Sequence, residues 1–154
     1  MKINWKSLIF FVAIPLITGG LSALVTMGSM EDYNNFEKPF LSPPAILFPI
    51  VWTILFVLMG IASYRVFESN CENKENALTI YFVQLVVNFI WPVLFFNLKV
   101  FFRAFLWLLF LWLLILLTII RFYKCDKISA YLMIPYILWV TFAGYLNFMI
   151  FLLN

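Results

Sequence analysis

The sequence predicts an all-α membrane protein: a bundle of five transmembrane helices whose long first loop acts as a lid. Of its 154 residues, 66% are hydrophobic and 11% are charged, and the mean hydropathy is +1.04. Soluble domains average roughly 45–50% apolar and about 25% charged residues, and a soluble core of this size cannot hide so much apolar surface. The apolar residues gather in runs of about 20, enough for a helix of about 30 Å.

The five runs are expected to form helices at residues 8–27, 49–67, 77–97, 104–122 and 130–153. The first follows Lys2 and Lys6, as the core of a signal peptide would. It is too long for that role and no small-residue cleavage site follows, so we predict a retained helix. The runs carry no Asp, Glu, Lys or Arg away from their ends. We therefore predict one domain over residues 1–154, without an internal repeat or an appended soluble domain.

The distribution of positive residues predicts the orientation of the bundle, because cytoplasmic loops carry an excess of Lys and Arg. With five spans, one side of the membrane holds Lys2, Lys6, Arg65, Lys74, Arg121, Lys124 and Lys127. The other side holds Lys38, Lys99 and Arg103. This bias predicts that the N-terminus lies inside and the first loop outside. The expected location of this integral, multi-pass protein is a bacterial cell membrane.

The composition also excludes several kinds of function. The net charge of +3 is scattered, so nucleic acid is not an expected partner. The chain has no histidine, which removes histidine-based acid–base catalysis and the usual haem ligand. There are no paired intramembrane carboxylates for proton coupling and no phosphate-binding glycine loop. Cys71 and Cys125 have no CxxC partner and are expected to be reduced thiols or incidental. No metal or cofactor is predicted.

Aromatic and amide side chains recur at helical spacing on three of the runs. The second run carries Trp52, Phe56 and Met59, the third carries Gln84, Asn88 and Trp91, and the fifth carries Tyr136, Trp139, Ala143 and Asn147. An unpaired amide in hydrocarbon costs several kcal/mol, so the amides should face the bundle interior. From spacing alone, hydrogen bonding between helices and the lining of a ligand pocket are about equally supported.

Three stretches of the chain carry a family resemblance. Tyr33 and the segment "EKPFLSPPAILFPIVWTILFVLMGIASY", then "QLVVNFIWPVLFF", then "PYILWVTFAGYLN" occur in order. Together they resemble the signatures of the TspO/MBR family, the tryptophan-rich sensory proteins related to the mitochondrial translocator protein (peripheral-type benzodiazepine receptor). The resemblance covers the whole bundle and implies five packed transmembrane helices, commonly dimeric, with the first loop closing over a pocket.

The resemblance implies binding of tetrapyrroles such as protoporphyrin IX and of benzodiazepine-type ligands. The pocket residues expected from the resemblance and the helical stripes are Tyr33, Pro43, Pro44, Phe48, Trp52, Phe56, Gln84, Asn88, Trp91, Tyr136, Trp139, Ala143 and Asn147. Membrane lipids and a second copy of the chain are the other expected partners. In the family, light- and oxygen-dependent porphyrin breakdown is also known, and here the catalytic residues would be Trp52 and Trp139.

The sequence departs from the family pattern at three places. No basic residue follows Tyr145, so the cholesterol-recognition pattern of mammalian members is absent and sterol binding is doubtful. Phe40 stands where the family often has Trp, so a reduced aromatic contact from the loop is expected. Pro92 directly follows Trp91 and should kink the third helix and free the carbonyl of Asn88.

Three functions remain open at this stage. The first is binding and sensing of a planar tetrapyrrole, the second is transport of porphyrins or sterol-like lipids across the membrane, and the third is a structural role beside other membrane proteins. The segment "KPFLSPP", Lys38 to Pro44, bears on the first. Its prolines favour an extended, low-entropy path, so we predict a stiff lid that carries Tyr33 and Phe40 over a pocket floored by Trp52 and Trp139.

Overall fold

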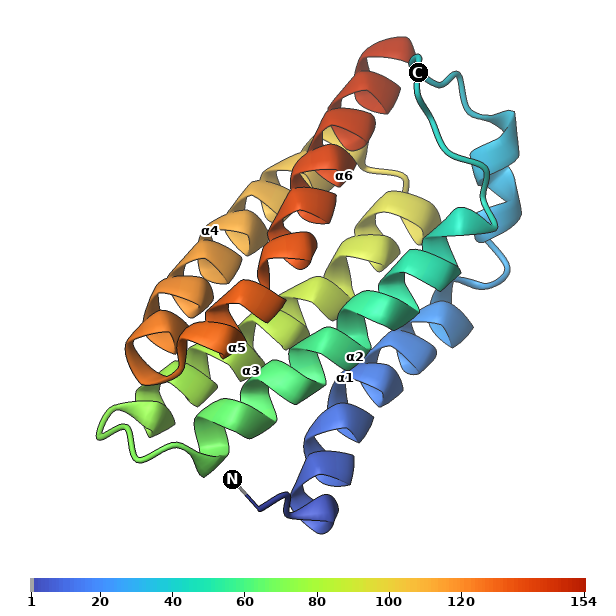
Figure 1. Cartoon of the computed structure of the whole chain (residues 1–154). Coiled ribbons are helices and arrows are strands. Elements are labelled where there is room, and N and C mark those ends of the chain that lie inside the picture. Colours follow the sequence, from blue (N-terminus) through green and yellow to red (C-terminus); the bar gives the residue numbers. More distant parts are fainter. Residues whose placement is uncertain (1) are drawn as a thin grey trace.

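The computed structural model describes residues 2–154 and confirms the five membrane-spanning segments (Figure 1). Within these residues the regular structure is entirely helical. The elements are α1 (Trp5–Thr26), the 3₁₀ helix η1 (Met30–Asn35), α2 (Leu47–Glu68), α3 (Lys74–Pro92), the π-helical turn η2 (Val93–Asn97), α4 (Phe101–Cys125), α5 (Lys127–Leu132) and α6 (Ile134–Leu153). By length and composition, each span is sufficient to cross a membrane.

Most helices extend a few residues beyond the predicted apolar runs, and polar side chains cap two of them, α1 and α5. The side chain of Asn4 accepts a hydrogen bond from the main-chain N–H of Ser7 and caps α1. Asp126 caps α5 by accepting from the main-chain N–H of Ser129 at 3.1 Å. Such caps supply partners for N–H groups that have none within the helix, so the helices continue into the polar boundary.

Two prolines interrupt the spans. The fifth is not one helix, as predicted, but two, α5 and α6, which meet at Met133. Pro135 lies in the first turn of α6, where its missing N–H is tolerated. In the third span, α3 ends at Pro92 and continues as the π-helical turn η2. Pro92 has no N–H to donate to the Asn88 carbonyl, and the wider turn follows directly from that break.

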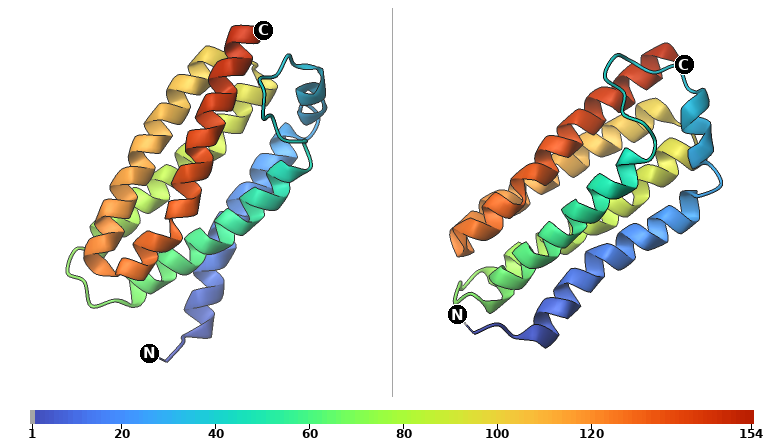
Figure 2. Two further views of the ribbon diagram at one scale, coloured as in Figure 1. Left: turned by 45° about the horizontal axis from the view of Figure 1, so that its top comes forward. Right: turned by 45° about the vertical axis from the view of Figure 1, so that its right-hand side comes forward.

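The spans run up and down, and the two ends of the described chain lie at opposite ends of the bundle (Figures 1 and 2). α1 lies along α2, α3 along α4, and α4 along α6, while α5 closes against α2. The closest approach joins α1 and α2: a Cβ added to Gly60 would lie 2.5 Å from the Cα of Val12. A glycine at this point therefore lets two membrane helices touch along their backbones.

The two cysteines form a disulfide, which corrects the prediction of reduced or incidental thiols. Cys71, between α2 and α3, is bonded to Cys125, the last residue of α4, across 54 residues of sequence. Next to it, the guanidinium of Arg65 pairs with the carboxylate of Asp126 at 2.7 Å. This end of the bundle, opposite the first loop, is therefore joined both covalently and by charge.

Candidate functional site

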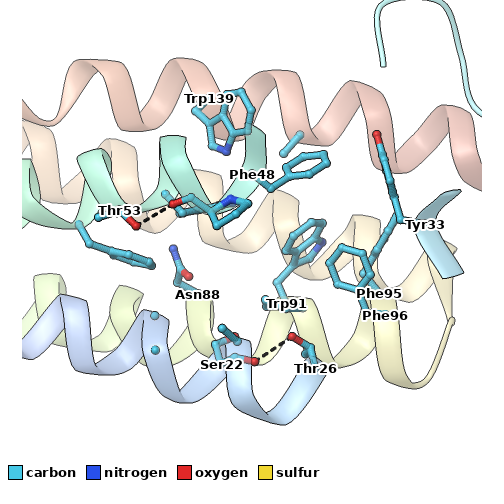
Figure 3. A pocket seen from close by; sticks show the side chains of 18 of the residues that line it. Ser22, Thr26, Tyr33, Phe48, Thr53, Asn88, Trp91, Phe95, Phe96 and Trp139 are labelled. Carbon is cyan, nitrogen blue, oxygen red and sulfur yellow. Dashed lines mark hydrogen bonds between the residues drawn. The ribbon is translucent and has the colours of Figure 1, made fainter. Parts of the chain in front are cut away.

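A cavity of about 260 Å³ lies between α1, α2, α3 and α6, under the first loop (Figure 3). Its lining residues are Leu16, Gly19, Gly20, Ser22, Ala23, Thr26, Tyr33, Phe48, Pro49, Trp52, Thr53, Phe56, Asn88, Trp91, Pro92, Phe95, Phe96, Trp139, Ala143, Leu146 and Asn147. The walls are mainly aromatic and small apolar groups. The volume lies just below the range of about 300–1,000 Å³ common for small-molecule sites, so a large planar ligand requires the walls to move apart.

The structure brings nine of the predicted binding residues together around this cavity. They are Tyr33, Phe48, Trp52, Phe56, Asn88, Trp91, Trp139, Ala143 and Asn147. Four other predicted residues, Pro43, Pro44, Gln84 and Tyr136, are not among its lining residues. The two predicted catalytic residues, Trp52 and Trp139, reach the cavity from α2 and α6.

Gln84 and Tyr136 lie behind the cavity wall in a buried hydrogen-bond network. The hydroxyl of Tyr136 donates to Oε1 of Gln84 at 2.6 Å and accepts from Nδ2 of Asn88 at 2.7 Å. Gln84 and Tyr136 are both completely buried. Side-chain hydrogen bonds of this kind hold membrane helices together. The network therefore positions Asn88, the member that reaches the cavity, by joining α3 to α6.

A second hydrogen-bond chain fixes the opposite end of the same wall. The indole N–H of Trp91 donates to Oδ1 of Asn147 at 3.0 Å, and Nδ2 of Asn147 donates to the Phe101 carbonyl at 2.8 Å. The Trp91 ring stacks on Phe95, with 5.2 Å between ring centroids. Amide groups therefore set the orientation of this indole ring, and the ring presents its face to the cavity.

The indole N–H of Trp139 differs from that of Trp91. Its Nε1 atom is buried and has no hydrogen-bond partner within the described chain. In Figure 3 the nitrogen lies on the side of the ring that faces the other lining side chains. A buried donor without an acceptor costs about 1–3 kcal/mol, so an acceptor on a bound molecule would relieve an existing penalty. This donor and the rings of Trp52, Phe48 and Trp91 all line the cavity.

The lid segment contributes Tyr33 but not Phe40. The Tyr33 side chain is 2% exposed, and its hydroxyl donates to the Pro43 carbonyl at 3.1 Å. Burial raises the pKa of Tyr33, although the nearby Ser42 hydroxyl opposes that rise, so the phenol is neutral near pH 7. Phe40 is 85% exposed, and the prediction that it would lie over the pocket is wrong. Phe40 and Leu41 form the tip of a turn, which the Ser42 N–H closes by donating to the Pro39 carbonyl at 3.3 Å. Leu41 has a φ of 76°, and the turn projects both side chains away from the bundle.

Lys38 organises the lid from within. Its ammonium donates to the carbonyls of Tyr33, Asn34 and Phe36 and lies 4.9 Å from the centre of the Tyr33 ring. These carbonyls belong to the end of η1, where helical acceptors lack partners. Lys38 therefore holds Tyr33 in its inward position.

The aromatic and amide residues at helical spacing did not predict that α1 lines the cavity. Six lining residues come from this helix, and Gly19, Gly20, Ser22 and Ala23 are the small ones. The only available signal was the run "GGLSA" inside an otherwise bulky apolar segment. Among the described residues, no group of three or more His, Cys, Asp or Glu side chains could hold a metal ion. The cavity therefore offers stacking and hydrogen bonding.

Comparison with known proteins agrees with this architecture. The profile of the TspO/MBR family matches residues 11–153. The chain belongs to the TspO/MBR family. Among its relatives is the Tryptophan-rich protein TspO of Archaeoglobus fulgidus, 35% identical over 98% of this chain and 99% of that protein. Protein CrtK of Rhodobacter capsulatus is 36% identical over 95% and 91%, and the Translocator protein of Sus scrofa is 29% identical over 94% and 88%.

Membership in the TspO/MBR family agrees with the fold and with the family resemblance seen in the sequence. The relatives include proteins named tryptophan-rich sensory protein as well as translocator proteins. This chain is therefore an integral, multi-pass membrane protein of a sensory and translocator family.

Proposed function

We propose that this protein binds and senses a planar, lipophilic ligand of the tetrapyrrole class, such as protoporphyrin IX, in the cavity beneath the lid. The observation that supports this most directly is the buried, unpartnered indole N–H of Trp139 beside the aromatic faces of Trp52 and Phe48. Aromatic rings offer stacking surfaces to a flat ligand, and the indole donor offers one directional bond. Benzodiazepine-type ligands, also flat and apolar, fit the same description.

The test is a titration of protoporphyrin IX against the protein in lipid vesicles, read by tryptophan fluorescence quenching. Saturable quenching with one site per chain is expected. Trp139→Phe keeps an aromatic face but removes the N–H, and should weaken binding roughly 3–10-fold, the value of one hydrogen bond. The matched control is Trp112→Phe, because the indole of Trp112 bonds to Thr141 on an exposed surface. Non-saturable quenching by wild type would overturn the proposal.

We propose further that bound porphyrin is degraded in light and oxygen with Trp52 and Trp139 as the reacting residues. Light-excited porphyrin takes an electron from an adjacent indole, and dioxygen adds to the resulting porphyrin radical anion. The adduct returns the electron to the indole radical cation, so the net reaction is addition of dioxygen to the porphyrin and the indole is regenerated. The double variant Trp52→Phe and Trp139→Phe should lose this reaction when the ligand concentration is raised to saturate it. Unchanged bleaching of bound porphyrin in the double variant would rule out Trp52 and Trp139 as the reacting residues.

The alternative function is transfer of porphyrins or sterol-like lipids across or along the membrane. Uncoupled transfer needs none of the ionisable residues that are missing from the spans. Flux of protoporphyrin between vesicle compartments separates the two functions: binding without protein-dependent flux supports sensing, and flux supports transfer. Cholesterol belongs in the same assay and is expected to compete weakly.

The proposed orientation places the N-terminus inside, following the positive residues. The Cys71–Cys125 disulfide lies at that same end of the bundle, whereas disulfides are rare in the reducing cytoplasm. The positive residues favour this end of the bundle inside, whereas the disulfide favours it outside. Thiol alkylation in acid-quenched cells decides between the two orientations. Free thiols in cells, which form the bond after oxidant is added, support the proposed orientation. A bond already formed in cells reverses it.

A further inference from the structure

The cavity is bounded by small residues where α1 passes α2. Gly20 and Ala23 of α1 and Pro49 and Thr53 of α2 all line the cavity. All four are also exposed on the outer surface of the chain. Because α1 and α2 are both membrane-spanning helices, the outer surface at this level faces lipid. These four residues therefore belong both to the cavity lining and to the lipid-facing surface. We call the space that they surround the gap.

Adjacent glycines of α1 meet different surroundings at this level. Toward the start of α1, Gly60 sits directly against the backbone of Val12, and a Cβ at Gly19 would overlap the Phe56 ring. One residue further along, and about 100° around the helix, a Cβ at Gly20 would meet no atom within 4 Å. Gly19 therefore faces α2, whereas Gly20, which also lines the cavity, faces open space.

The other boundaries of the cavity are covered. Between α2 and α6, the Phe48 ring lies 6.0 Å from the Trp139 ring, and the Trp52 ring lies 6.1 Å from the Tyr136 ring. At the lid end, the Tyr145 hydroxyl donates to the Phe40 carbonyl. Aromatic rings and the lid therefore obstruct these two sides, in contrast to the gap beside Gly20.

The hydroxyl groups near the gap are paired within their own helices or across α1 and α3. Thr53 donates to the Pro49 carbonyl at 2.7 Å, and Thr26 donates to the Ser22 carbonyl at 2.9 Å (Figure 3). Ser22 donates to the Phe89 carbonyl at 3.4 Å. A molecule passing between the helices therefore meets methyl and methylene groups, with no unpaired hydroxyl donor from these three residues. Such a passage suits an apolar, bilayer-dissolved molecule and disfavours a hydrated one.

We propose that the gap between Gly20, Ala23, Pro49 and Thr53 is a lateral opening through which the ligand enters from the membrane, and that Gly20 sets its width. This proposal rests on the proposed function for its ligand, and it specifies the ligand class as molecules that partition into lipid. The lid then serves to retain the ligand and is not the entrance.

The test compares wild type, Gly20→Ala and Gly20→Leu in vesicles that contain the dimethyl ester of protoporphyrin IX, followed by stopped-flow tryptophan quenching. The Leu side chain occupies the opening, so both the association and the dissociation rate constants should fall at least tenfold. The dissociation constant should change by a smaller factor than either rate constant, because both rates pass the same constriction. A weaker affinity with an unchanged dissociation rate constant would mean that Leu only fills the cavity, and would overturn the opening. Gly20→Ala should give an intermediate rate.

The matched control is Gly28→Leu. Gly28 is also an exposed glycine, and a Cβ added to it would meet no atom within 4 Å, but it does not line the cavity. Its rates should equal those of wild type. Unchanged rates in Gly20→Leu, or an equal loss in Gly28→Leu, would overturn the lateral opening while leaving the proposed ligand site intact.

A second measurement does not depend on porphyrin binding. In vesicles of phosphatidylcholine brominated on its acyl chains, bromine quenches the tryptophans that it can reach. Wild type and Gly28→Leu should be quenched more strongly than Gly20→Leu, because the Leu side chain would cover the approach to Trp52 between α1 and α2. Equal quenching of all three would overturn the opening. Absence of saturable porphyrin binding together with this difference would instead overturn only the proposed ligand.

Discussion

The side-chain amide of Asn154 pairs with both main-chain groups of Glu37. Its Oδ1 accepts from the Glu37 N–H at 3.2 Å, and its Nδ2 donates to the Glu37 carbonyl at 2.9 Å. The Asn154 amide thus makes the same pair of backbone hydrogen bonds to Glu37 that a neighbouring β-strand would make. Together with the bond from Tyr145 to Phe40 and the ion pair from Lys99 to Asp32 at 2.7 Å, it fastens the lid to the bundle.

These lid contacts predict a measurable change in backbone protection. Asn154→Ala and Tyr145→Phe each remove hydrogen bonds to the lid, so amide hydrogen exchange over residues 37–44 should accelerate several-fold. Each bond lies at an exposed position and contributes at the lower end of the usual range of about 0.5–1.5 kcal/mol. Tyr131→Phe, an exposed tyrosine at the other end of the bundle, is the control and should leave lid exchange unchanged.

The lid prolines are predicted to act on affinity more than on stability. Neither Pro43 nor Pro44 lines the cavity, but the Pro43 carbonyl holds the Tyr33 hydroxyl. Pro43→Gly together with Pro44→Gly frees the backbone and lets Tyr33 leave the cavity wall. The variant should therefore lose more free energy of porphyrin binding, measured by titration, than free energy of unfolding, measured by thermal unfolding in detergent. A stability loss without an affinity loss would mean that the segment is only a linker.

The disulfide predicts sensitivity of unfolding to reductant. The bond closes a loop across 54 residues of sequence, and cross-links of this kind typically contribute about 2–4 kcal/mol. Reductant should lower the midpoint of thermal unfolding of wild type. The double variant Cys71→Ser and Cys125→Ser should start from the lowered midpoint and show no further response, and peptide mapping without reductant should identify the linked pair.

The Arg65–Asp126 pair predicts a loss of stability in acid. Burial raises the pKa of Asp126, but hydrogen bonds from Arg65 and Ser129 and the charge of Arg65 outweigh it and hold the pKa below its ordinary value. A carboxyl whose pKa is lower in the folded state stabilises the fold above its unfolded value of about 3.9 and loses that contribution as pH falls through the folded value. Asp126→Asn should therefore flatten the fall of the unfolding midpoint below about pH 4. Glu72→Gln, at an exposed position, should retain it.

The buried network predicts a cost for removing a single hydroxyl. Tyr136→Phe leaves Oε1 of Gln84 and Nδ2 of Asn88 without the partner that each has now. Buried polar groups left unpaired cost about 1–3 kcal/mol, so the unfolding midpoint should drop well beyond that of Tyr131→Phe. Porphyrin affinity should fall as well, because Asn88 loses its fixed orientation. An unchanged midpoint would show that water replaces the hydroxyl.

The five spans follow from hydropathy because each helix must satisfy its backbone in lipid and needs about 20 apolar residues to cross it. The aromatic and amide stripes identified seven of the side chains that line the cavity, namely Trp52, Phe56, Asn88, Trp91, Trp139, Ala143 and Asn147. The role of α1 could not be obtained in the same way, since its lipid-facing and cavity-facing sides are both apolar. Gly20 and Gly60 look alike in sequence, yet one faces open space and the other faces the backbone of Val12.

The remaining differences arise from contacts between distant residues. Cys71 and Cys125 approach one another only after α3 and α4 have packed as an antiparallel pair, and nothing local to either residue specifies this. Phe40 points outward because it lies at the tip of the turn between Pro39 and Ser42. The number of aromatic residues in the loop does not predict which of them face the cavity.

The cross-linked end of the bundle has a mechanical consequence for the cavity. The disulfide joins the α2–α3 connection to α4, and the Arg65–Asp126 pair joins α2 to the α4–α5 connection. The cavity lies toward the other end, where the lid, the hydrogen bonds of Tyr136 and Asn147 and side-chain packing hold the helices. We therefore expect relative bending of these helices to be smallest at the cross-linked end and larger at the cavity. Reducing the disulfide should loosen that end, so we expect its redox state to affect how far the cavity walls can separate, although neither cysteine lines the cavity.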